Sequence, residues 1–336
     1  MTVAQVRDVA ALARVSPATV SNALNHPAKV SPTTLARIQA AIDELGYIRN
    51  DAARQLRAGT NHAVGMIVLD IANPFFTDVA RGVEDVLVAD RRPLILGNSA
   101  QEAARETTYL DLFEQQRMSG VLITPVENVI DRLRRLRDRG TSVVLVDRMT
   151  RAKEFSSVAV DDKMGGRIAT EHLLEMGRRR IGFIGGPAHL AQVKTRFAAA
   201  RAAVEAHGGS EIRLVESATM NAEAGRAGAE ELLALPAKQR PDAVFAANDL
   251  VALGVLQALT LAGVRVPDDI AIIGYDDIDF AASAAIPLSS VRQPAHEMGS
   301  TAASLLLDVI ADPTSAKIKH ITLKPELVVR RSTVGA

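Results

Sequence analysis

SPATVSNAL, residues 16–24, predicts a short helix near the start of this 336-residue chain. Ser16 is a favoured N-cap, and Pro17 suits the first helical position because that position needs no N–H partner. Val20 and Leu24 lie four residues apart and can face a small core. The other faces carry small hydrogen-bonding side chains in place of the Lys and Glu of an ordinary surface helix. Such side chains suit close approach to base edges and phosphates.

The segment before this helix predicts a partner for it. Val6, Val9, Ala10 and Ala13 mark one face of a helix that runs to about Ala13, and Arg14-Val15 reads as a tight turn. Two short helices meeting at a steep angle form a helix-turn-helix, whose second helix enters the major groove of DNA. A small helical hairpin without a DNA function remains open on this local pattern.

The order of further motifs makes a resemblance specific. VRDVA at 6–10, VSPATVS at 15–21, ELGY at 44–47 and NDAARQL at 50–56 resemble the LacI/GalR family of bacterial transcriptional regulators. The resemblance extends over essentially the whole chain and implies double-stranded, palindromic operator DNA as a partner. It places the DNA-binding residues at Val6, Ser16, Pro17, Ala18, Thr19, Ser21, Asn22 and Asn25, with Ala53, Arg54 and Leu56 in a hinge helix.

Two positions depart from the family pattern. The family usually has Gly in the turn where this chain has Arg14. If that residue is left-handed, Arg costs about 1 kcal/mol relative to Gly. The family also often has Arg where this chain has Asn22. Because Arg suits guanine and Asn suits adenine, this change predicts a different base preference.

Composition and charge restrict the setting. Lys and Arg equal Asp and Glu at 39 each, but residues 1–60 hold seven basic and four acidic residues. A small basic N-terminal region on a larger acidic remainder predicts few phosphate contacts per subunit. Tight DNA binding would therefore need the N-terminal regions of two subunits. The absence of Cys excludes disulfides and thiol ligands and favours a reducing compartment. Without a signal-like start or a long apolar run, we expect a cytoplasmic protein with no membrane partner.

Two further segments complete the N-terminal region. Ser31 and Pro32 predict the start of a third helix, Leu35, Ile38, Ile42 and Leu45 its buried stripe, and Gly46 its end. Residues 50–57 are too few for a stable free helix, so this segment should fold only with a partner. Its likeness to the family hinge helix implies pairing in the minor groove with Leu56 as a wedge. A plain linker fits the composition nearly as well; the resemblance decides between them.

From Ala63 onward the sequence pattern changes and predicts short apolar strands that alternate with amphipathic helices. The expected strands are 64–69, 93–97, 120–125 and 142–146, then 180–185, 212–215, 243–247 and 270–275. Two such series predict two doubly wound parallel sheets, one in each of two lobes. The second half of the chain resembles the periplasmic sugar-binding fold that the family shares, which implies a two-lobed α/β domain of the periplasmic-binding-protein type. We expect a helix-turn-helix domain at 1–49, a hinge at 50–62 and an effector domain at 63–331. Lobe one would comprise 63–160 and 293–320, and lobe two 161–290 and 321–331. With no heptad extension after Arg331, a homodimer is the default.

Polar residues at the strand ends suit a sugar, whose hydroxyls both donate and accept hydrogen bonds. By resemblance to ribose-binding proteins and ribose-type repressors, the ligand residues are Asn73, Phe75, Phe76, Asp147, Arg148, Arg196, Asn248, Asp276 and Gln293. Arg196 is expected to open a helix, and one of the two phenylalanines to belong to the core. One family aromatic has no match, and the nearest position is Met220. The resemblance makes ribose the leading effector, and the missing aromatic keeps other pentoses or a related hexose open.

Catalytic motifs are missing from the sequence. There is no Gly-x-Ser-x-Gly elbow, phosphate loop or metal-ligand spacing, and the seven His residues are scattered. Asp161-Asp162 reads as a crossover or surface pair. We therefore expect no catalytic residues, no metal and no cofactor. The function indicated is a sugar-controlled repressor. The alternatives are a sugar isomerase or dehydrogenase, a transport binding protein, and a regulator that responds to a nucleoside or sugar phosphate.

Overall fold

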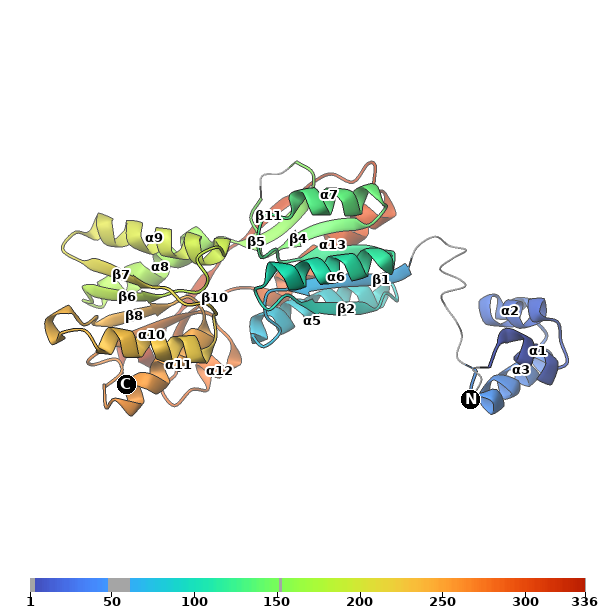
Figure 1. Ribbon diagram of the computed structural model, residues 1–336, viewed down its shortest axis with the longest axis horizontal. Helices are drawn as coiled ribbons and strands as arrows, with labels where there is room; N and C mark the ends of the chain where they lie inside the picture. The colour runs from blue at the N-terminus through green and yellow to red at the C-terminus, as the bar shows by residue number, and fades with distance from the viewer. Residues whose placement is uncertain (1–3, 48–60, 151–152, 336) are drawn as a thin grey trace. The chain divides into compact units, whose positions relative to one another are not determined.

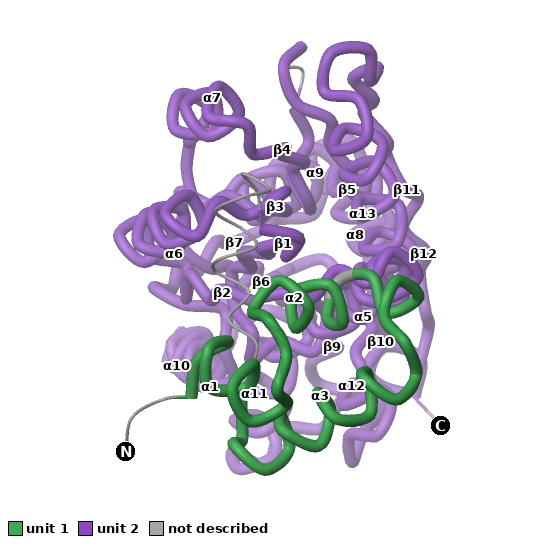
Figure 2. Tube along the Cα trace, turned by 90° about the vertical axis from the view of Figure 1, so that its right-hand side faces the viewer, with its two compact units in different colours: residues 1–60 green, residues 61–336 purple. Residues whose placement is uncertain are grey.

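A computed structural model describes residues 4–47, 61–150 and 153–335 of the chain. They fall into two compact units, Met1–Thr60 and Asn61–Ala336, coloured separately in Figure 2. Within the described ranges, no helix is both long and apolar enough to cross a membrane.

Unit one is a helix-turn-helix. It contains α1 (Val6–Leu12), α2 (Pro17–Asn25), the short 3₁₀ helix η1 (Pro27–Lys29) and α3 (Pro32–Leu45). Ser16 and Ser31 cap α2 and α3 through their side chains, and Gly46 ends α3 with φ 57°. Val9, Val20 and Ile38 come from the three helices and are at most 1 % exposed. The structure confirms the predicted caps and core stripe. They could be predicted because each of these features depends on residues of its own helix.

Sheet one of unit two has six parallel strands in the order β11-β5-β4-β3-β1-β2 (Figure 1). The strands are β1 (Asn61–Val68), β2 (Leu94–Asn98), β3 (Met118–Ile123), β4 (Ser142–Val146), β5 (Ser156–Val160) and β11 (His320–Leu323). Helices α5 (Pro74–Ala89) and α13 (Ala295–Ala311) pack on one face. Helices α6 (Ala103–Gln115) and α7 (Ile130–Asp138) pack on the other.

Sheet two has the order β12-β10-β9-β8-β6-β7, and β12 alone runs antiparallel to its neighbour. Its strands are β6 (Arg180–Ile184), β7 (Glu211–Val215), β8 (Ala243–Ala246), β9 (Ala271–Asp276), β10 (Ser289–Arg292) and β12 (Glu326–Val328). The main helices are α8 (Asp162–Glu175), α9 (Ala191–His207), α10 (Ala222–Leu233) and α11 (Asp249–Leu261). Shorter elements are η2 (Ala237–Gln239), α12 (Asp279–Ala282) and α14 (Arg331–Val334). The expected fold class, a helical N-terminal unit followed in the chain by two largely parallel α/β lobes, is confirmed.

Close packing of α5 against α13 depends on a pair of glycines. A Cβ on Gly82 would lie 2.1 Å from the carbonyl oxygen of His296, and one on Gly299 would lie 1.9 Å from that of Val79. Real Cβ atoms do not approach oxygen so closely, so only glycine allows the two helices this separation. The two glycines therefore set the distance at which α13 packs against α5 in lobe one, after the chain has returned from lobe two.

Strand β11 corrects one predicted boundary. Residues 321–331 were assigned to lobe two, but Ile321 pairs with Val158 and Leu323 with Val160, both in sheet one. The chain therefore crosses to sheet two only after Leu323, where Leu327 pairs with Val291. Strands of three or four residues, such as β10, β11 and β12, lack the apolar runs that reveal longer strands. β5 has five residues but begins with two serines, which shorten its apolar run.

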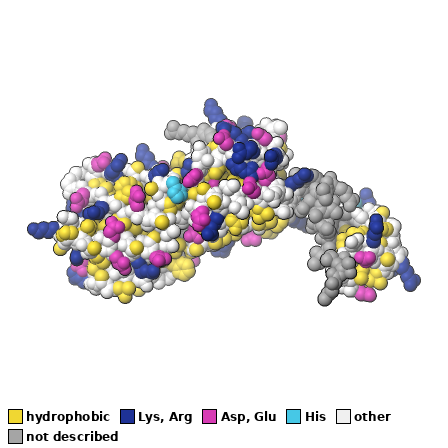
Figure 3. All heavy atoms as spheres, in the orientation of Figure 1, with side chains coloured by type: hydrophobic (Ala, Val, Ile, Leu, Met, Phe, Trp, Pro, Cys, Tyr) yellow, Lys and Arg dark blue, Asp and Glu magenta, His cyan; other side chains and the backbone are white. Residues whose placement is uncertain are grey.

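Helix α7 carries a dense arginine cluster, visible over α7 as mixed dark blue and magenta side chains in Figure 3. Arg132 pairs with Asp111 and Glu114 of α6, and Arg134 pairs with Glu154 and with Asp131. Since these guanidinium groups are matched by nearby carboxylates, the cluster resembles a solvated ion-pair surface rather than a basic patch for nucleic acid.

Candidate functional site

Helix α2 presents the predicted small polar face. The Ser16 hydroxyl oxygen accepts a hydrogen bond from the Thr19 backbone N–H at 3.1 Å and lies 2.9 Å from the Thr19 hydroxyl. Ser16, Pro17, Ala18 and Asn22 are exposed, and Thr19, Ser21 and Val6 are half-buried. Asn25 is the last residue of α2. The exposed side of the helix thus carries groups that can reach base edges.

The turn before α2 is held by a side chain that the sequence reading did not single out. Arg14 has φ 53°, so the left-handed conformation considered for it is present. Arg37 of α3 donates from Nη2 to the backbone oxygens of Ala13 at 2.6 Å and Arg14 at 3.3 Å. This contact ties the turn to α3 and offsets part of the conformational cost of Arg14. The hinge residues Ala53, Arg54 and Leu56 lie outside the described residues.

In unit two, Asn73 places two aromatic rings at the carboxyl end of β1. Its Oδ1 accepts a hydrogen bond from the Phe75 N–H at 3.1 Å and so caps α5. Phe75 and Phe76 are 3 % and 5 % exposed, and their ring centroids lie 5.0 Å apart in an edge-to-face arrangement. Both rings therefore contribute to the apolar wall beside Asn73.

Arg196 is the buried cation of lobe two. Its Nε donates to Asp162 Oδ1 at 2.7 Å, its Nη1 donates to the Ala247 oxygen at 2.8 Å, and its guanidinium lies 3.6 Å from the centroid of the Tyr275 ring. Tyr275 also donates to Asp162 at 3.1 Å. Asp162 lies at the crossover from sheet one to lobe two, as expected, but its interpretation as a surface residue is wrong, because α8 directs it inward at 8 % exposure. Arg196 also does not open its helix, since α9 begins at Ala191.

Asp276 joins the two lobes. Asn73 of lobe one donates from Nδ2 to Asp276 Oδ2 at 2.8 Å, and Gln293 donates from Nε2 to Asp276 Oδ1 at 2.7 Å. Asp276 lies at the end of β9 with φ 106°, and Gln293 follows β10. Residues 203 and 17 positions away in sequence thus meet on one carboxylate.

A second contact between the lobes involves Gln192, which was not predicted. Gln192 of α9 donates from Nε2 to the Asp147 backbone oxygen at 2.8 Å and to Asp147 Oδ2 at 3.0 Å. Asp147 follows β4 with φ 51°. We call the following residues the cross-lobe cluster: Asn73, Asp147, Asp162, Gln192, Arg196, Tyr275, Asp276 and Gln293.

Asn248 borders this cluster. It caps α11 by accepting from the Val251 N–H at 2.9 Å, and its Nδ2 donates to the Met220 backbone oxygen at 3.2 Å. Met220 is 9 % exposed, and its side chain lies against Gly186. The position without the family aromatic therefore contacts Asn248 through its backbone.

Burial sets the charge states of the cluster. Burial and neighbouring Asp162 raise the pKa of Asp147 to about 8, although Arg196 and Gln192 oppose the shift. Burial also raises the pKa of Asp276 to about 6, against Arg196 and the amide donors of Asn73 and Gln293. For Arg196, burial alone would lower the pKa, but Asp162, Tyr275 and Asp276 raise it above its usual value.

Arg148 stands apart from the cluster contacts. It is half-buried, and its charge acts on Glu106 of α6. Glu106 is 1 % exposed and accepts a hydrogen bond from the Val126 N–H at 2.7 Å. The nine residues expected to bind a ligand therefore divide. The hydrogen bonds link Asn73, Asp147, Arg196, Asp276 and Gln293 to the cluster, Phe75, Phe76 and Asn248 flank it, and Arg148 acts electrostatically on Glu106.

Two family models match the chain, one in each compact unit. Residues 5–50 match the family described as bacterial regulatory proteins, lacI family, and residues 170–333 match the periplasmic binding protein-like domain. The ribose operon repressor of Bacillus subtilis is 37% identical over 310 residues, covering 91% of this chain and 92% of that protein. The chain belongs to the lacI family of bacterial regulatory proteins. As a lacI-family member, it is a DNA-binding transcriptional regulator.

Two further relatives cover most of the chain. The HTH-type transcriptional repressor PurR of Aliivibrio fischeri (strain ATCC 700601 / ES114) is 32% identical over 336 residues, covering 98% of both proteins. A LacI family transcriptional regulator from Enterococcus faecium, solved with bound ribose, superposes with a TM-score of 0.73 at 29% identity. That match covers 81% of this lacI-family chain and 98% of the other.

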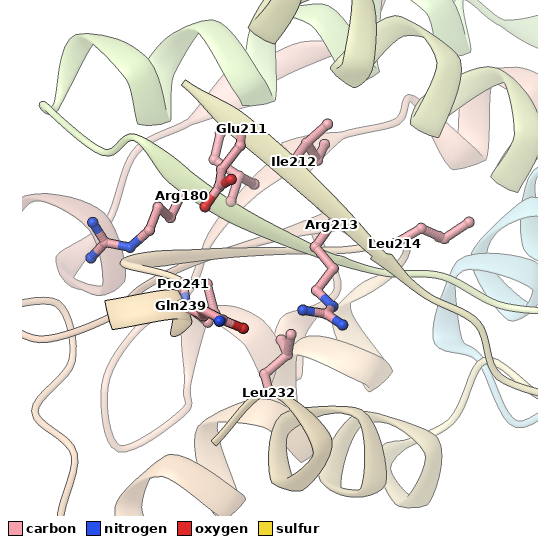
Figure 4. Close-up of a pocket in the computed structure, with 9 residues that line it drawn as sticks. Arg180, Glu211, Ile212, Arg213, Leu214, Leu232, Gln239 and Pro241 are labelled. Atoms are coloured by element: carbon pink, nitrogen blue, oxygen red, sulfur yellow. The ribbon is translucent and has the colours of Figure 1, made fainter. Parts of the chain in front are cut away.

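A hollow of about 520 Å³ lies away from the cluster, at the amino-terminal ends of β6 and β7 (Figure 4). Arg180 and Glu211 begin those strands, and Arg213 extends toward Leu232 of α10. Its charged lining residues are exposed or half-buried, which sets it apart from the buried cluster of this lacI-family regulator. Among the residues described, no group of three or more His, Cys, Asp or Glu could hold a metal ion.

Proposed function

We propose that this regulator represses transcription from operator DNA and that a small sugar, ribose or another pentose, controls its DNA affinity. The supporting observation is Asp276, a buried carboxylate of lobe two that accepts hydrogen bonds from Asn73 of lobe one and from Gln293. A hydroxyl-bearing ligand at this point would contact both lobes at once. Its binding energy would therefore depend on how the lobes are placed.

The relatives favour a sugar, and ribose first among sugars. One is named as a ribose operon repressor, and one solved relative contains bound ribose. The cluster offers the carboxylates and the arginine that bind hydroxyls through charge-assisted hydrogen bonds. We propose Asn73, Phe75, Phe76, Asp147, Arg148, Arg196, Asn248, Asp276 and Gln293 as the ligand residues. A nucleoside or a sugar phosphate is the competing effector.

On the DNA side, we propose base and phosphate contacts from the face of α2. The candidate residues are Val6, Ser16, Pro17, Ala18, Thr19, Ser21, Asn22 and Asn25. A homodimer on a palindromic operator would place two N-terminal domains on the DNA. We expect two to be needed because the positive charge of residues 1–60 is small. Exposed apolar residues at the β2 edge of sheet one, Ile95 and Leu96, together with Val88 of α5, favour self-association there.

We propose no catalytic reaction and a cytoplasmic site of action, where operator DNA is available. The buried ionisable groups of the cluster already have structural partners: Asp162 is paired with Arg196 inside lobe two, and Asp276 joins the lobes by accepting from the amides of Asn73 and Gln293. This arrangement supports ligand-dependent closure. Changing a two-state population from 1:99 to 99:1 needs about 5.5 kcal/mol of differential affinity, within reach of a few such contacts.

The first prediction tests this function directly. Ribose should bind the full-length protein in calorimetry and weaken its hold on operator DNA in a gel-shift titration. 2-Deoxyribose should bind at least 10-fold more weakly, because a site built for hydroxyls leaves its own polar groups unpaired when one is missing. If operator binding is unchanged by every pentose while a nucleoside or phosphate ester releases it, the sugar assignment is wrong and the regulator assignment stands.

A further inference from the structure

Three buried oxygens of the cross-lobe cluster accept no hydrogen bond from any residue within 4–47, 61–150 and 153–335. They are Asp147 Oδ1, Gln192 Oε1 and Gln293 Oε1, and the three residues are 5 %, 4 % and 4 % exposed. Buried polar atoms are nearly always satisfied, so three such oxygens in one cluster require an explanation.

Hydrogen-bonding chemistry determines which end of the Gln192 and Gln293 amides has no partner among the described residues. The Asp147 backbone oxygen can only accept, so the Gln192 NH₂ group must face it and Oε1 must point elsewhere. Gln293 likewise turns its NH₂ group to Asp276 Oδ1. Asn73 differs, because its Oδ1 caps α5 while its Nδ2 binds Asp276, and both ends are used. The unused oxygens of Gln192 and Gln293 are therefore acceptors that need external donors, and Asp147 Oδ1 can accept from a hydroxyl when ionised or donate to one when protonated.

The charge of the cluster adds a second restriction. Asp147, Asp162 and Asp276 are buried with Arg196 as the one buried cation among the cluster residues. Arg148, half-buried, has Glu106 as its neighbour. Even with Asp147 protonated, Asp162 and Asp276 outnumber the single cation Arg196, and an anionic ligand would bring a further negative charge into this surplus of carboxylates, where weak screening makes repulsion strong.

We propose that Gln192 is a ligand-binding residue and that, with Asp147 and Gln293, it selects a neutral ligand rich in hydroxyl donors over a phosphorylated one. This inference rests on the proposed sugar effector and specifies its chemistry. Because Asp147 of the other lobe holds the Gln192 NH₂ group, the Oε1 acceptor is correctly aimed only when the lobes are joined. Gln192 thereby links recognition of a hydroxyl to closure.

Full-length wild type, Gln192→Met and Lys194→Met provide the test. Methionine matches glutamine in length but lacks its acceptor and donor, and Lys194 is an exposed residue of the same helix. Calorimetry with ribose should show roughly 10–100-fold weaker binding for Gln192→Met and wild-type binding for Lys194→Met. Circular dichroism and the thermal unfolding midpoint, measured for all three proteins without sugar, show that each variant is folded.

A second measurement needs no variant. Ribose 5-phosphate should bind wild type at least 10-fold more weakly than ribose, because of the surplus of carboxylates. Equal ribose affinity in Gln192→Met and wild type would refute the role of Gln192 and leave the sugar effector intact. Equal or tighter binding of ribose 5-phosphate would refute the selection for a neutral ligand. If wild type bound no sugar, the proposed effector would fail, and this inference with it.

Discussion

At the scale of single residues, backbone strain marks the ends of two strands. Asp147, Asp276 and Asp277 have φ of 51°, 106° and 59°. Side chains with a Cβ rarely adopt this region, and each such residue costs about 1–3 kcal/mol. The first two lie in the cross-lobe cluster, and Asp277 binds Arg292 and Arg330. The left-handed backbone turns these carboxyl groups toward partners that they would not reach if the strand continued regularly.

Glu106 carries a prediction of pH dependence. Burial, aided by Glu127, raises its pKa from 4.5 to about 7, although the Val126 N–H and Arg148 oppose the shift. A carboxyl with a raised folded-state pKa stabilises the fold fully below pH 4.5 and loses that contribution as the pH rises through 7. Glu106→Gln keeps an acceptor for Val126 but cannot ionise. Its free energy of unfolding should exceed that of wild type by up to about 3 kcal/mol above pH 7.

Denaturant unfolding at pH 5 and pH 8 measures this difference. The gain should be small at pH 5 and larger at pH 8. Glu102→Gln, at an exposed position just before the same helix, should show no comparable pH-dependent gain. An equal effect of Glu106→Gln at both pH values would show that ionisation of this carboxyl is not the cause.

At the scale of elements, the contact between α5 and α13 gives the next prediction. Gly299→Ala would place a Cβ 1.9 Å from the Val79 carbonyl oxygen and force the helices apart. Overpacking of this kind costs about 1–3 kcal/mol or more, so the thermal midpoint should fall by several degrees. Gly185→Ala is the matched control, because its Cβ would meet only side-chain carbons at 3.4 Å and beyond. Similar destabilisation by both substitutions would contradict the proposed role of the close contact.

The elements also show what the sequence can and cannot predict. Ser31, Pro32 and Gly46 define α3 because capping depends on adjacent residues, and buried parallel strands such as β3 form apolar runs. Short β11 gives no such signal, and its partner β5 lies about 160 residues earlier in the chain. The site follows the same division. Asp147 and Asp276 are predictable at strand ends, whereas Asp162 and Gln192 become site residues only through the packing of α8 and α9.

At the scale of the whole molecule, Arg148 should separate DNA binding from ligand response. It follows Asp147 at the carboxyl end of β4, and the hydrogen bonds that join the lobes do not involve it. Arg148→Ala should therefore bind operator like wild type but lose about 10–100-fold in sugar affinity, giving a repressor that sugar does not release. Gel-shift titrations with ribose measure both properties. Met149→Ala, at an exposed neighbouring position, is the control, and release of Arg148→Ala at the wild-type ribose concentration would contradict this role.

The path of the chain through the two sheets has a consequence for recombination and for the design of chimaeras. The backbone passes from sheet one to sheet two after β5, returns after β10, and passes again between β11 and β12. Neither lobe is a continuous cassette, so a new ligand specificity in lobe two cannot be grafted with a single splice. A functional exchange would need three junctions, near residues 161, 293 and 324. Genetic shuffling at one point would leave β11 or β12 beside a foreign sheet. Diversification of this architecture should therefore proceed by point substitution at the strand ends more readily than by exchange of whole lobes.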